Sequence, residues 1–266
     1  MNAQIEEAPQ GELLLRRQEG GVLRLTLNRP GQYNALSEEM LEALRVALAR
    51  IAEDSSVRVL VLGAAGKAFC AGHDLRQMRS QPRLDYYQKL FTDCARVMSQ
   101  IRQLPQPVIA RVQGLATAGG CQLVATCDLA VAADSARFAV SGINVGLFCS
   151  TPSVPLSRNM GQKQAFEMLV TGDFVDARTA LERGLVNRVV PAAQLDAEID
   201  SLAASIVSKP AHVLAAGKSL FYRQREMGID AAYQLAVQAM ACNVMEGDAQ
   251  EGIDAFLAKR PPQWRS

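Results

Sequence analysis

Two glycine-containing turns in the sequence can present backbone N–H groups to a bound molecule. In one of them, Gly119 and Gly120 precede a stretch of helical composition, residues 122–127. Glycine has no Cβ, so the atoms of another molecule can approach its backbone closely, and the first N–H groups of a helix have no partner within the helix. A turn of this kind stabilises negative charge.

The second turn ends in Gly72, which is followed by His73 and comes after an apolar run at residues 57–63. A single glycine pair more often only tightens a turn between two elements. Two such turns in one chain, however, can bring their N–H groups together around one oxygen atom. Residues 66–75 and 114–128 are therefore the candidate site.

The elements expected to position these turns alternate between strand and helix. Short apolar runs bounded by glycine or proline predict strands, and apolar residues at helical spacing predict helices, the first of them capped by Ser37. Strands are predicted over residues 12–17, 21–28, 57–63, 107–112 and 129–133, and long helices over residues 38–51 and 83–104. The sequence thus predicts an α/β protein.

From residue 192 onward the pattern is helical almost throughout. Helices are predicted over residues 192–207, 211–227, 230–245 and 248–259. The loss of strands divides the chain into a core, residues 1–191, and a C-terminal helical region, residues 192–266. From the pattern alone, these helices either dock against neighbouring subunits or cover the sheet of their own chain.

Composition argues against several classes of protein. The 266 residues are 49% hydrophobic, which is enough for a full core, and the 28 basic and 27 acidic residues are interspersed, so no nucleic-acid partner is expected. No apolar run reaches the roughly 18 residues of a membrane span. Residues 1–11 lack both a basic region and an apolar core, which predicts a cytoplasmic protein. The six cysteines lie apart, so free thiols and no metal site are expected.

Three motifs resemble the crotonase superfamily, which includes enoyl-CoA hydratases and isomerases. They are residues 67–75 (KAFCAGHDL), Gly119-Gly120-Cys121 with Cys127-Asp128, and residues 27–30 (LNRP) with Asn34-Ala35-Leu36. The similarity runs from about Glu12 to Trp264. It implies a crotonase-like spiral of ββα units with a C-terminal helical region that assembles homotrimers or dimers of trimers.

The resemblance also implies the residues of the site. The backbone N–H groups of His73 and Gly119 would bind the oxygen of a CoA thioester and stabilise its enolate. No prosthetic group is implied, because coenzyme A enters as part of an acyl-CoA substrate of fatty acyl-CoA metabolism. The CoA path would be lined by Arg29, Gln32, Tyr33, Ala71, Asp74 and Leu75, and closed by Phe256 and Lys259 from a neighbouring subunit.

The sequence departs from the family at the two positions where hydratases hold glutamates. Gln122 occupies one of them and Gly142 the other. Glutamine can hold a water molecule but cannot accept its proton, and glycine has no side chain. Each acid–base group contributes roughly 10²–10⁴ to the rate. Efficient hydration is therefore not expected, and a double-bond isomerase is disfavoured on the same ground.

Two other side chains are candidates to replace the glutamates. His73 titrates near neutrality, but its role in the family belongs to the backbone, so its side chain is expected to point away from the site. Cys149 follows a segment that faces the acyl pocket in the family. Its thiol could move a proton or act as a nucleophile, although most lone cysteines are inert and apolar.

Three functions remain open from the sequence. The first is an acyl-CoA enzyme, a lyase of the hydratase/isomerase family with altered chemistry. The second is a decarboxylase of a malonyl-type CoA thioester, because residues 71–74 and 143–146 are similar to such decarboxylases within the family, although these hold a tyrosine at the position of Cys149. The third is a CoA-thioester-binding protein without turnover.

Overall fold

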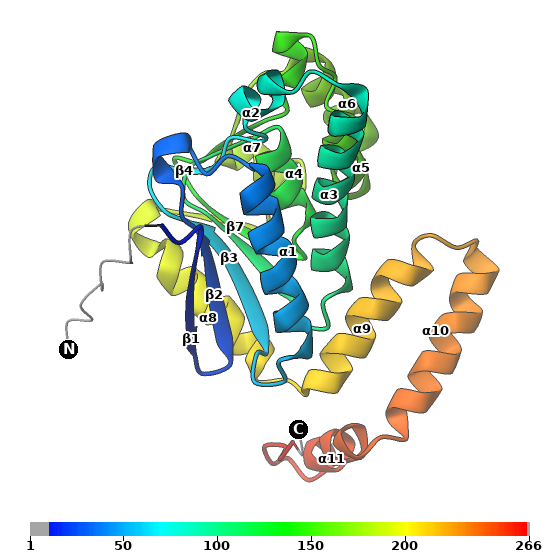
Figure 1. Ribbon diagram of the computed structural model, residues 1–266. Coiled ribbons are helices and arrows are strands. Elements are labelled where there is room, and N and C mark those ends of the chain that lie inside the picture. The colour runs from blue at the N-terminus through cyan, green and yellow to red at the C-terminus, as the bar shows by residue number, and fades with distance from the viewer. Residues whose placement is uncertain (1–10, 265–266) are drawn as a thin grey trace, which may run out of the picture.

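The computed structural model describes residues 11–264, in which the larger of two sheets has six strands (Figure 1). Their order is β1-β2-β3-β5-β7-β10; β1 runs antiparallel to β2, and the other neighbours are parallel. The strands are β1 (Leu14–Glu19), β2 (Val22–Leu27), β3 (Val59–Ala64), β5 (Val108–Val112), β7 (Leu129–Ala133) and β10 (Arg188–Val190).

A smaller sheet of four strands runs alongside, in the order β4-β6-β8-β9. Each of β3, β5 and β7 is followed by one of its strands, and helices then lead back to the larger sheet. This repeated strand–strand–helix unit confirms the predicted spiral of ββα units. The strands are β4 (Ala68–Cys70), β6 (Leu115–Thr117), β8 (Arg137–Ala139) and β9 (Val175–Asp176).

The larger sheet is buried on both faces. Along β3, Leu60 and Leu62 belong to the main core, whereas Val59 and Val61 pack with a second cluster on the opposite face. All six residues of this strand are buried, as in parallel strands covered on both sides. The covering helices are α1 (Glu38–Glu53) and α3 (Leu84–Gln103) on the main core and α8 (Leu195–Val207) on the other face.

Local sequence explains where α1 begins. The hydroxyl of Ser37 accepts a hydrogen bond from the N–H of Met40 at 3.3 Å. Glu38 lies in the first turn, where its negative charge is attracted by the positive end of the helix dipole. Leu44 and Leu48 are buried at helical spacing against the core. The predicted helix over residues 38–51 is therefore found, extended by two residues.

Helix α4 (Gly119–Thr126) lies at the centre of the fold and begins three residues earlier than predicted. Gly119 and Gly120 form its first turn, and every residue of the helix is buried. Ala118, which precedes it, has a φ of +48°. An alanine rarely adopts this conformation, so surrounding contacts must impose it.

The remaining helices connect the spiral. They are α2 (Leu75–Ser80), α5 (Ser150–Asn159), α6 (Gln162–Thr171) and α7 (Ala177–Glu182), with short 3₁₀ turns at Pro30–Gln32, Ser141–Val145 and Ala192–Gln194. Within residues 11–264, no helix has the length and apolar character that a membrane span requires.

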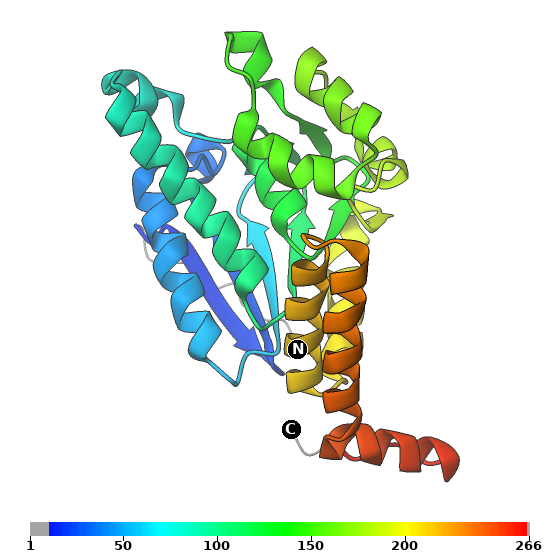
Figure 2. The same ribbon diagram turned by 90° about the vertical axis from the view of Figure 1, so that its right-hand side faces the viewer.

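The C-terminal helices divide into two groups. Whereas α8 covers the sheet of its own chain, α9 and α10 form an antiparallel pair beside the α/β core, and α11 lies at the end of this pair opposite the loop that joins α9 to α10 (Figures 1 and 2). On α10, Tyr233, Val237 and Met240 are exposed by 66%, 66% and 77%. The bounds are α9 (Ala211–Gln224), α10 (Ile229–Val244) and α11 (Gly247–Leu257). The division of the chain at residue 192 stays a prediction.

A buried ion pair joins α9 to the spiral. The ammonium of Lys218 lies 2.6 Å from a carboxylate oxygen of Asp128, and the hydroxyl of Tyr222 donates to the other oxygen at 2.7 Å. The N–H of Val108 also donates to Asp128, at 2.7 Å. The start of β5, the end of α4 and the middle of α9 thus meet at one carboxylate.

Candidate active site

The two glycine turns are in direct contact. A Cβ placed on Gly72 would lie 2.9 Å from the Cβ of Ala118 and 3.1 Å from the nitrogen of Gly119, and the φ of Gly72 is +91°. A Cβ on Gly120 would lie 2.0 Å from the carbonyl oxygen of Cys70. Only glycine at these positions lets the first turn of α4 reach the loop that follows β4.

Two N–H groups in this contact have no partner in secondary structure. Leu36 pairs with the residues on either side of His73: its N–H donates to the carbonyl of Gly72 at 2.8 Å, and its carbonyl accepts from Asp74 at 3.4 Å. In such a parallel bridge the N–H of His73 faces away from Leu36. Gly119 begins a helix, so its N–H has no acceptor within α4. Both sequence-predicted donors therefore lie in one contact.

Beside these donors lies a cavity of about 250 Å³. It runs between the turns, α2, α3 and the segment before α5, and its walls are mainly apolar. Among the residues that line it, no aspartate, glutamate, lysine or arginine is found in the part of the chain that the structure describes. The lining includes His73, Met78, Phe91, Gln122, Phe148 and Cys149.

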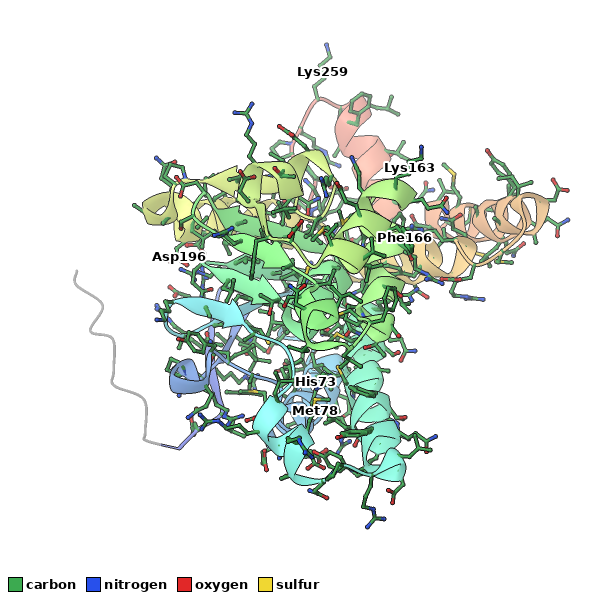
Figure 3. All side chains as sticks on the ribbon, turned by 90° about the horizontal axis from the view of Figure 1, so that it is seen from above. His73, Met78, Lys163, Phe166, Asp196 and Lys259 are labelled. Carbon is green, nitrogen blue, oxygen red and sulfur yellow. The ribbon has the colours of Figure 1, made fainter. Side chains whose placement is uncertain are left out.

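His73 lies in the wall of this cavity, and the expectation that only its backbone N–H serves the site stays a prediction. Its ring meets the ring of Phe91 edge-on, with 5.4 Å between the centroids, and Figure 3 shows it beside Met78. Neither ring nitrogen forms a hydrogen bond with a described residue. Burial lowers the pKa of the imidazole, an effect that the nearby carbonyl of Leu36 offsets in part. The ring is therefore neutral at pH 7.

Gln122 lies in the first turn and a half of α4. Its side chain is only 3% exposed, and its amide oxygen is buried without a hydrogen-bond partner among the described residues. A glutamine in this place can hold a substrate group or a water molecule but cannot take its proton.

Cys149 fills the space beside Gly142. A Cβ on Gly142 would lie 2.7 Å from the sulfur of Cys149 and 2.5 Å from the carbonyl oxygen of Leu147. The thiol contacts the carbonyl of Val140 at 3.5 Å, and burial raises its pKa. At neutral pH the thiol is protonated, which disfavours a role for Cys149 as a nucleophile. Its sulfur occupies the space into which a side chain at position 142 would extend.

The residues predicted for the CoA path form one group at the mouth of the cavity. Arg29 pairs with Asp74 at 3.5 Å, and the N–H of Ala71 donates to the carbonyl of Tyr33 at 3.0 Å. Asp74 also caps α2, and Leu75 begins that helix with 58% of its surface exposed.

Two more residues belong to the mouth. Gln32 lies in the 3₁₀ turn between Arg29 and Tyr33. Sequence reasoning missed Lys67, an exposed cation 5.2 Å from the centroid of the Tyr33 ring. Lys67 is the first residue of the KAFCAGHDL motif, and this position in the sequence could have indicated that it belongs to the site.

Phe256 and Lys259 are not part of this group in the single chain. They lie in and just after α11, at the end of the molecule opposite α2 (Figure 1), and Lys259 is far from His73 in the view from above (Figure 3). Phe256 is 82% exposed. Their placement at the CoA path from a neighbouring subunit stays a prediction.

Known proteins resemble the chain over nearly its whole length. The enoyl-CoA hydratase/isomerase family matches residues 17–266. The enoyl-CoA hydratase domain-containing protein 3, mitochondrial, of Xenopus laevis is 45% identical over 95% of this chain and 86% of its own length. This agrees with the crotonase-like motifs found in the sequence.

Solved structures give the same result. An enoyl-CoA hydratase from Mycobacterium smegmatis is 60% identical with a TM-score of 0.94, covering 96% of this chain and 100% of that one. The human enoyl-CoA hydratase domain-containing protein 3 is 44% identical with a TM-score of 0.92, covering 95% and 100%.

These relatives overturn the predicted location. The proteins from Xenopus laevis, Rattus norvegicus and Homo sapiens are all named mitochondrial. The prediction of a cytoplasmic protein is therefore wrong. It depended on residues 1–11 alone, most of which lie outside the described residues.

Proposed function

The chain belongs to the enoyl-CoA hydratase/isomerase family, and we propose that it binds a CoA thioester and stabilises the enolate of its acyl group. The observation that supports this most directly is the contact between the Gly72 and Gly119 turns. In this proposal the N–H groups of His73 and Gly119 donate to the thioester oxygen. Negative charge grows on that oxygen as the enolate forms, so one donor fixed in advance is worth about 3 kcal/mol.

The mouth of the cavity is the proposed path of coenzyme A. Lys67 and Arg29 supply positive charge for its phosphates, and the exposed ring of Tyr33 offers a surface for its base. Phe256 and Lys259 complete the path from a second copy, within the homotrimer or dimer of trimers that the family resemblance implies. The exposed apolar side chains of α10 favour such an assembly. The substrates belong to fatty acyl-CoA metabolism.

Hydration is the less favoured reaction at this site. It requires one group to take a proton from water and another to deliver a proton to carbon. Gln122 cannot take a proton, and the thiol of Cys149 holds its own because burial raises its pKa. Among the described residues of the cavity wall, His73 is the one neutral base, but its ring nitrogens are buried among protein atoms.

Decarboxylation of a malonyl-type thioester is the second candidate reaction. It needs no base at the outset, because the departing CO₂ leaves its electron pair on the enolate. The absence of lysine and arginine among the described residues that line the cavity supports this reading. An unpaired carboxylate in apolar surroundings is destabilised, and its loss as CO₂ relieves that cost.

Mass spectrometry of CoA thioesters separates these functions. Enoyl-, 3-hydroxyacyl-, malonyl- and methylmalonyl-CoA are incubated with wild type, with Gln122→Glu, and with Gln162→Glu as a matched exposed control. Loss of CO₂ with wild type supports the decarboxylase, and a gain or loss of water supports the hydratase and refutes the acid–base argument.

The variant adds a further distinction. Hydration by Gln122→Glu but not by wild type would mean that the enolate-stabilising groups are competent and the natural reaction lies elsewhere. Binding of thioesters, measured as a rise in melting temperature without any product, would identify a CoA-thioester-binding protein. Failure of every thioester to bind would refute the proposed function.

A further inference from the structure

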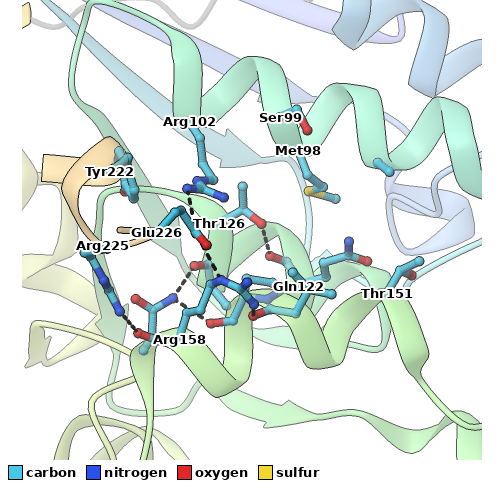
Figure 4. Close-up of a pocket in the computed structure, with 15 residues that line it drawn as sticks. Met98, Ser99, Arg102, Gln122, Thr126, Thr151, Arg158, Tyr222, Arg225 and Glu226 are labelled. Carbon is cyan, nitrogen blue, oxygen red and sulfur yellow. Dashed lines mark hydrogen bonds and ion pairs between the residues drawn. The ribbon is translucent and has the colours of Figure 1, made fainter. Parts of the chain in front are cut away.

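A second cavity lies on the other side of Gln122 from the first. Its volume is about 170 Å³, it is lined by α3, α4, α5 and the end of α9, and it opens to solvent at Arg158, Arg225 and Glu226. Gln122 and Thr151 line both cavities. The close-up in Figure 4 shows these two side chains at one end, with Tyr222, Arg225 and Glu226 at the other. One buried glutamine and one threonine therefore separate the two spaces.

The far end of the second cavity carries an excess of positive charge. Arg102, Arg158 and Arg225 line it together with a single carboxylate, Glu226. Glu226 lies 3.7 Å from Arg102 and 3.5 Å from Arg158. The guanidinium of Arg225 donates to the backbone carbonyl of Arg158 and forms no ion pair in the described part of the chain.

The ion pairs of Glu226 are loose compared with others in the protein. Arg111 contacts both oxygens of Asp196, at 2.7 and 2.8 Å, as a guanidinium does when it is fully engaged with a carboxylate. The guanidinium groups of Arg102 and Arg158 are not engaged in this way. They keep N–H donors for a second carboxylate.

The rest of this cavity is apolar. Met98, Ala125, Val154 and Pro155 line it between the arginines and Gln122. Such a wall suits methylene groups, which are stabilised by removal from water. A molecule that fits the whole cavity is therefore apolar along its length and anionic at its end.

We propose that the second cavity receives the distal end of the acyl chain and binds a carboxylate there. On the proposed function, the reacting thioester lies in the first cavity, and the chain continues past Gln122 into the second. The preferred substrates are then CoA thioesters of dicarboxylic acids, whose free carboxylate pairs with Arg158 and Arg225. The amide side chain of Gln122, whose oxygen has no hydrogen-bond partner in the described part of the chain, moves aside as the acyl chain passes.

The test compares pairs of thioesters that differ only in the distal group. For each of several increasing chain lengths, an acyl-CoA ending in a methyl group and one ending in a carboxylate are titrated calorimetrically into the protein of 266 residues. Beyond the length that passes Gln122, the carboxylate is expected to tighten binding about tenfold, as a charge-assisted hydrogen bond would. Equal affinities at every length would overturn the proposal.

Two arginine variants test where the carboxylate binds. In Arg158→Gln and Arg225→Gln the preference for the carboxylate should fall to nearly one, whereas Arg183→Gln, whose partner Glu167 lies outside the cavity, should keep it. Circular dichroism checks that each variant is folded. Because the two arginines are replaced separately, the test remains possible if one of the variants does not fold. Retention of the full preference in both folded variants would refute the assignment.

Two further titrations distinguish a free carboxylate from one at the end of an acyl chain, and a failure of this inference from a failure of the proposed function. Adipate alone is titrated into wild type: binding that the arginine variants abolish supports a carboxylate site at these arginines, and such binding without any carboxylate preference among the long acyl-CoA pairs would overturn the acyl path. Butyryl-CoA reports on the thioester site by itself. If butyryl-CoA binds and no carboxylate preference appears, only this inference fails; if no thioester binds, the proposed function fails and this inference with it.

Discussion

Removal of the Asp128 carboxylate should destabilise the protein more than removal of any exposed acid. Its partner Lys218 is 7% exposed in its side chain, and Asp128 is 14% exposed. In Asp128→Ala the ammonium stays buried with two backbone carbonyls as its remaining partners, those of Ile101 and Gln106. Breaking a buried pair by removing one partner costs about 3–5 kcal/mol.

Other groups lose their partner in the same variant. The N–H of Val108 and the hydroxyl of Tyr222 both donate to Asp128, at 2.7 Å each. A buried donor left without an acceptor costs about 1–3 kcal/mol, although water can enter beside α9 and reduce this loss. We therefore expect the free energy of unfolding to fall by about 4 kcal/mol, near the middle of the range for a broken buried pair.

The double variant Asp128→Ala/Lys218→Met tests whether the loss comes from a stranded charge. It removes both charges and keeps an apolar stem where the lysine stem packs. Replacing a buried pair by apolar groups is often nearly neutral, so the double variant should recover much of the lost stability. A double-mutant cycle with Lys218→Met alone then gives the coupling between the two side chains.

Urea unfolding followed by circular dichroism measures these differences at one protein concentration, which matters because assembly adds to apparent stability. The control is Asp93→Ala, since Asp93 pairs with Lys89 at 2.8 Å but Lys89 is 65% exposed. That variant should lose less than about 1 kcal/mol. If Asp128→Ala loses no more than the control, the argument from burial is wrong.

Three further predictions concern the cavity and its mouth. Burial lowers the pKa of His73 below its value in the unfolded chain, so at a pH between these two values the unfolded state binds more protons than the folded state. The free energy of unfolding should therefore decrease as the pH drops below about 6.5. Urea unfolding of His73→Leu should lack this pH dependence. Gly142→Ala places a Cβ 2.7 Å from the sulfur of Cys149 and should lose about 1–3 kcal/mol in the same assay, part of which Cys149→Ala restores; an unchanged stability would contradict the crowding. Lys67→Ala should weaken the binding of free coenzyme A, measured by calorimetry, most strongly at low salt, whereas the exposed Lys163→Ala on α6 should not.

The amphipathic helices and buried strands were predictable because their signals are local. The apolar spacing and the Ser37 cap define α1, and the apolar run of β3 needs no knowledge of its neighbours. The strands of the smaller sheet were not predicted. β4, β6 and β8 have three residues each and are stabilised by pairing with strands more than twenty residues away in sequence. No window along the chain contains that information.

Tertiary packing also decided what the C-terminal helices do. Leu195 and Ile199 give α8 an apolar face, and Tyr233 and Val237 give α10 another. Both helices carry an apolar face, but α8 covers a face of the larger sheet, whereas α10 packs against α9 and leaves Tyr233 and Val237 exposed. Which apolar face finds a partner depends on where the chain brings it.

The candidate site was predictable in its backbone and less so in its side chains. The Gly72 and Gly119 turns came from the sequence because glycine itself marks a close approach. The contact between the His73 ring and Phe91 did not, because it joins a loop to a helix, α3, that is separate in sequence. The side chain of Cys149 likewise lies beside Gly142 only because the segment before α5 folds back on itself.

Ten residues of the chain connect the thioester site to α9. Gly119 begins α4 at the proposed oxygen-binding donors, Gln122 separates the two cavities, and Asp128, just after the helix, binds α9 through Lys218. Because α4 is buried throughout, a shift at one end displaces its other end as well. The end of α9, which forms part of the wall of the second cavity, is therefore linked to α4 through the Asp128 pair, and to α3 and α5 through Glu226. The same carboxylate that stabilises the fold thus also helps to position a wall of the second cavity.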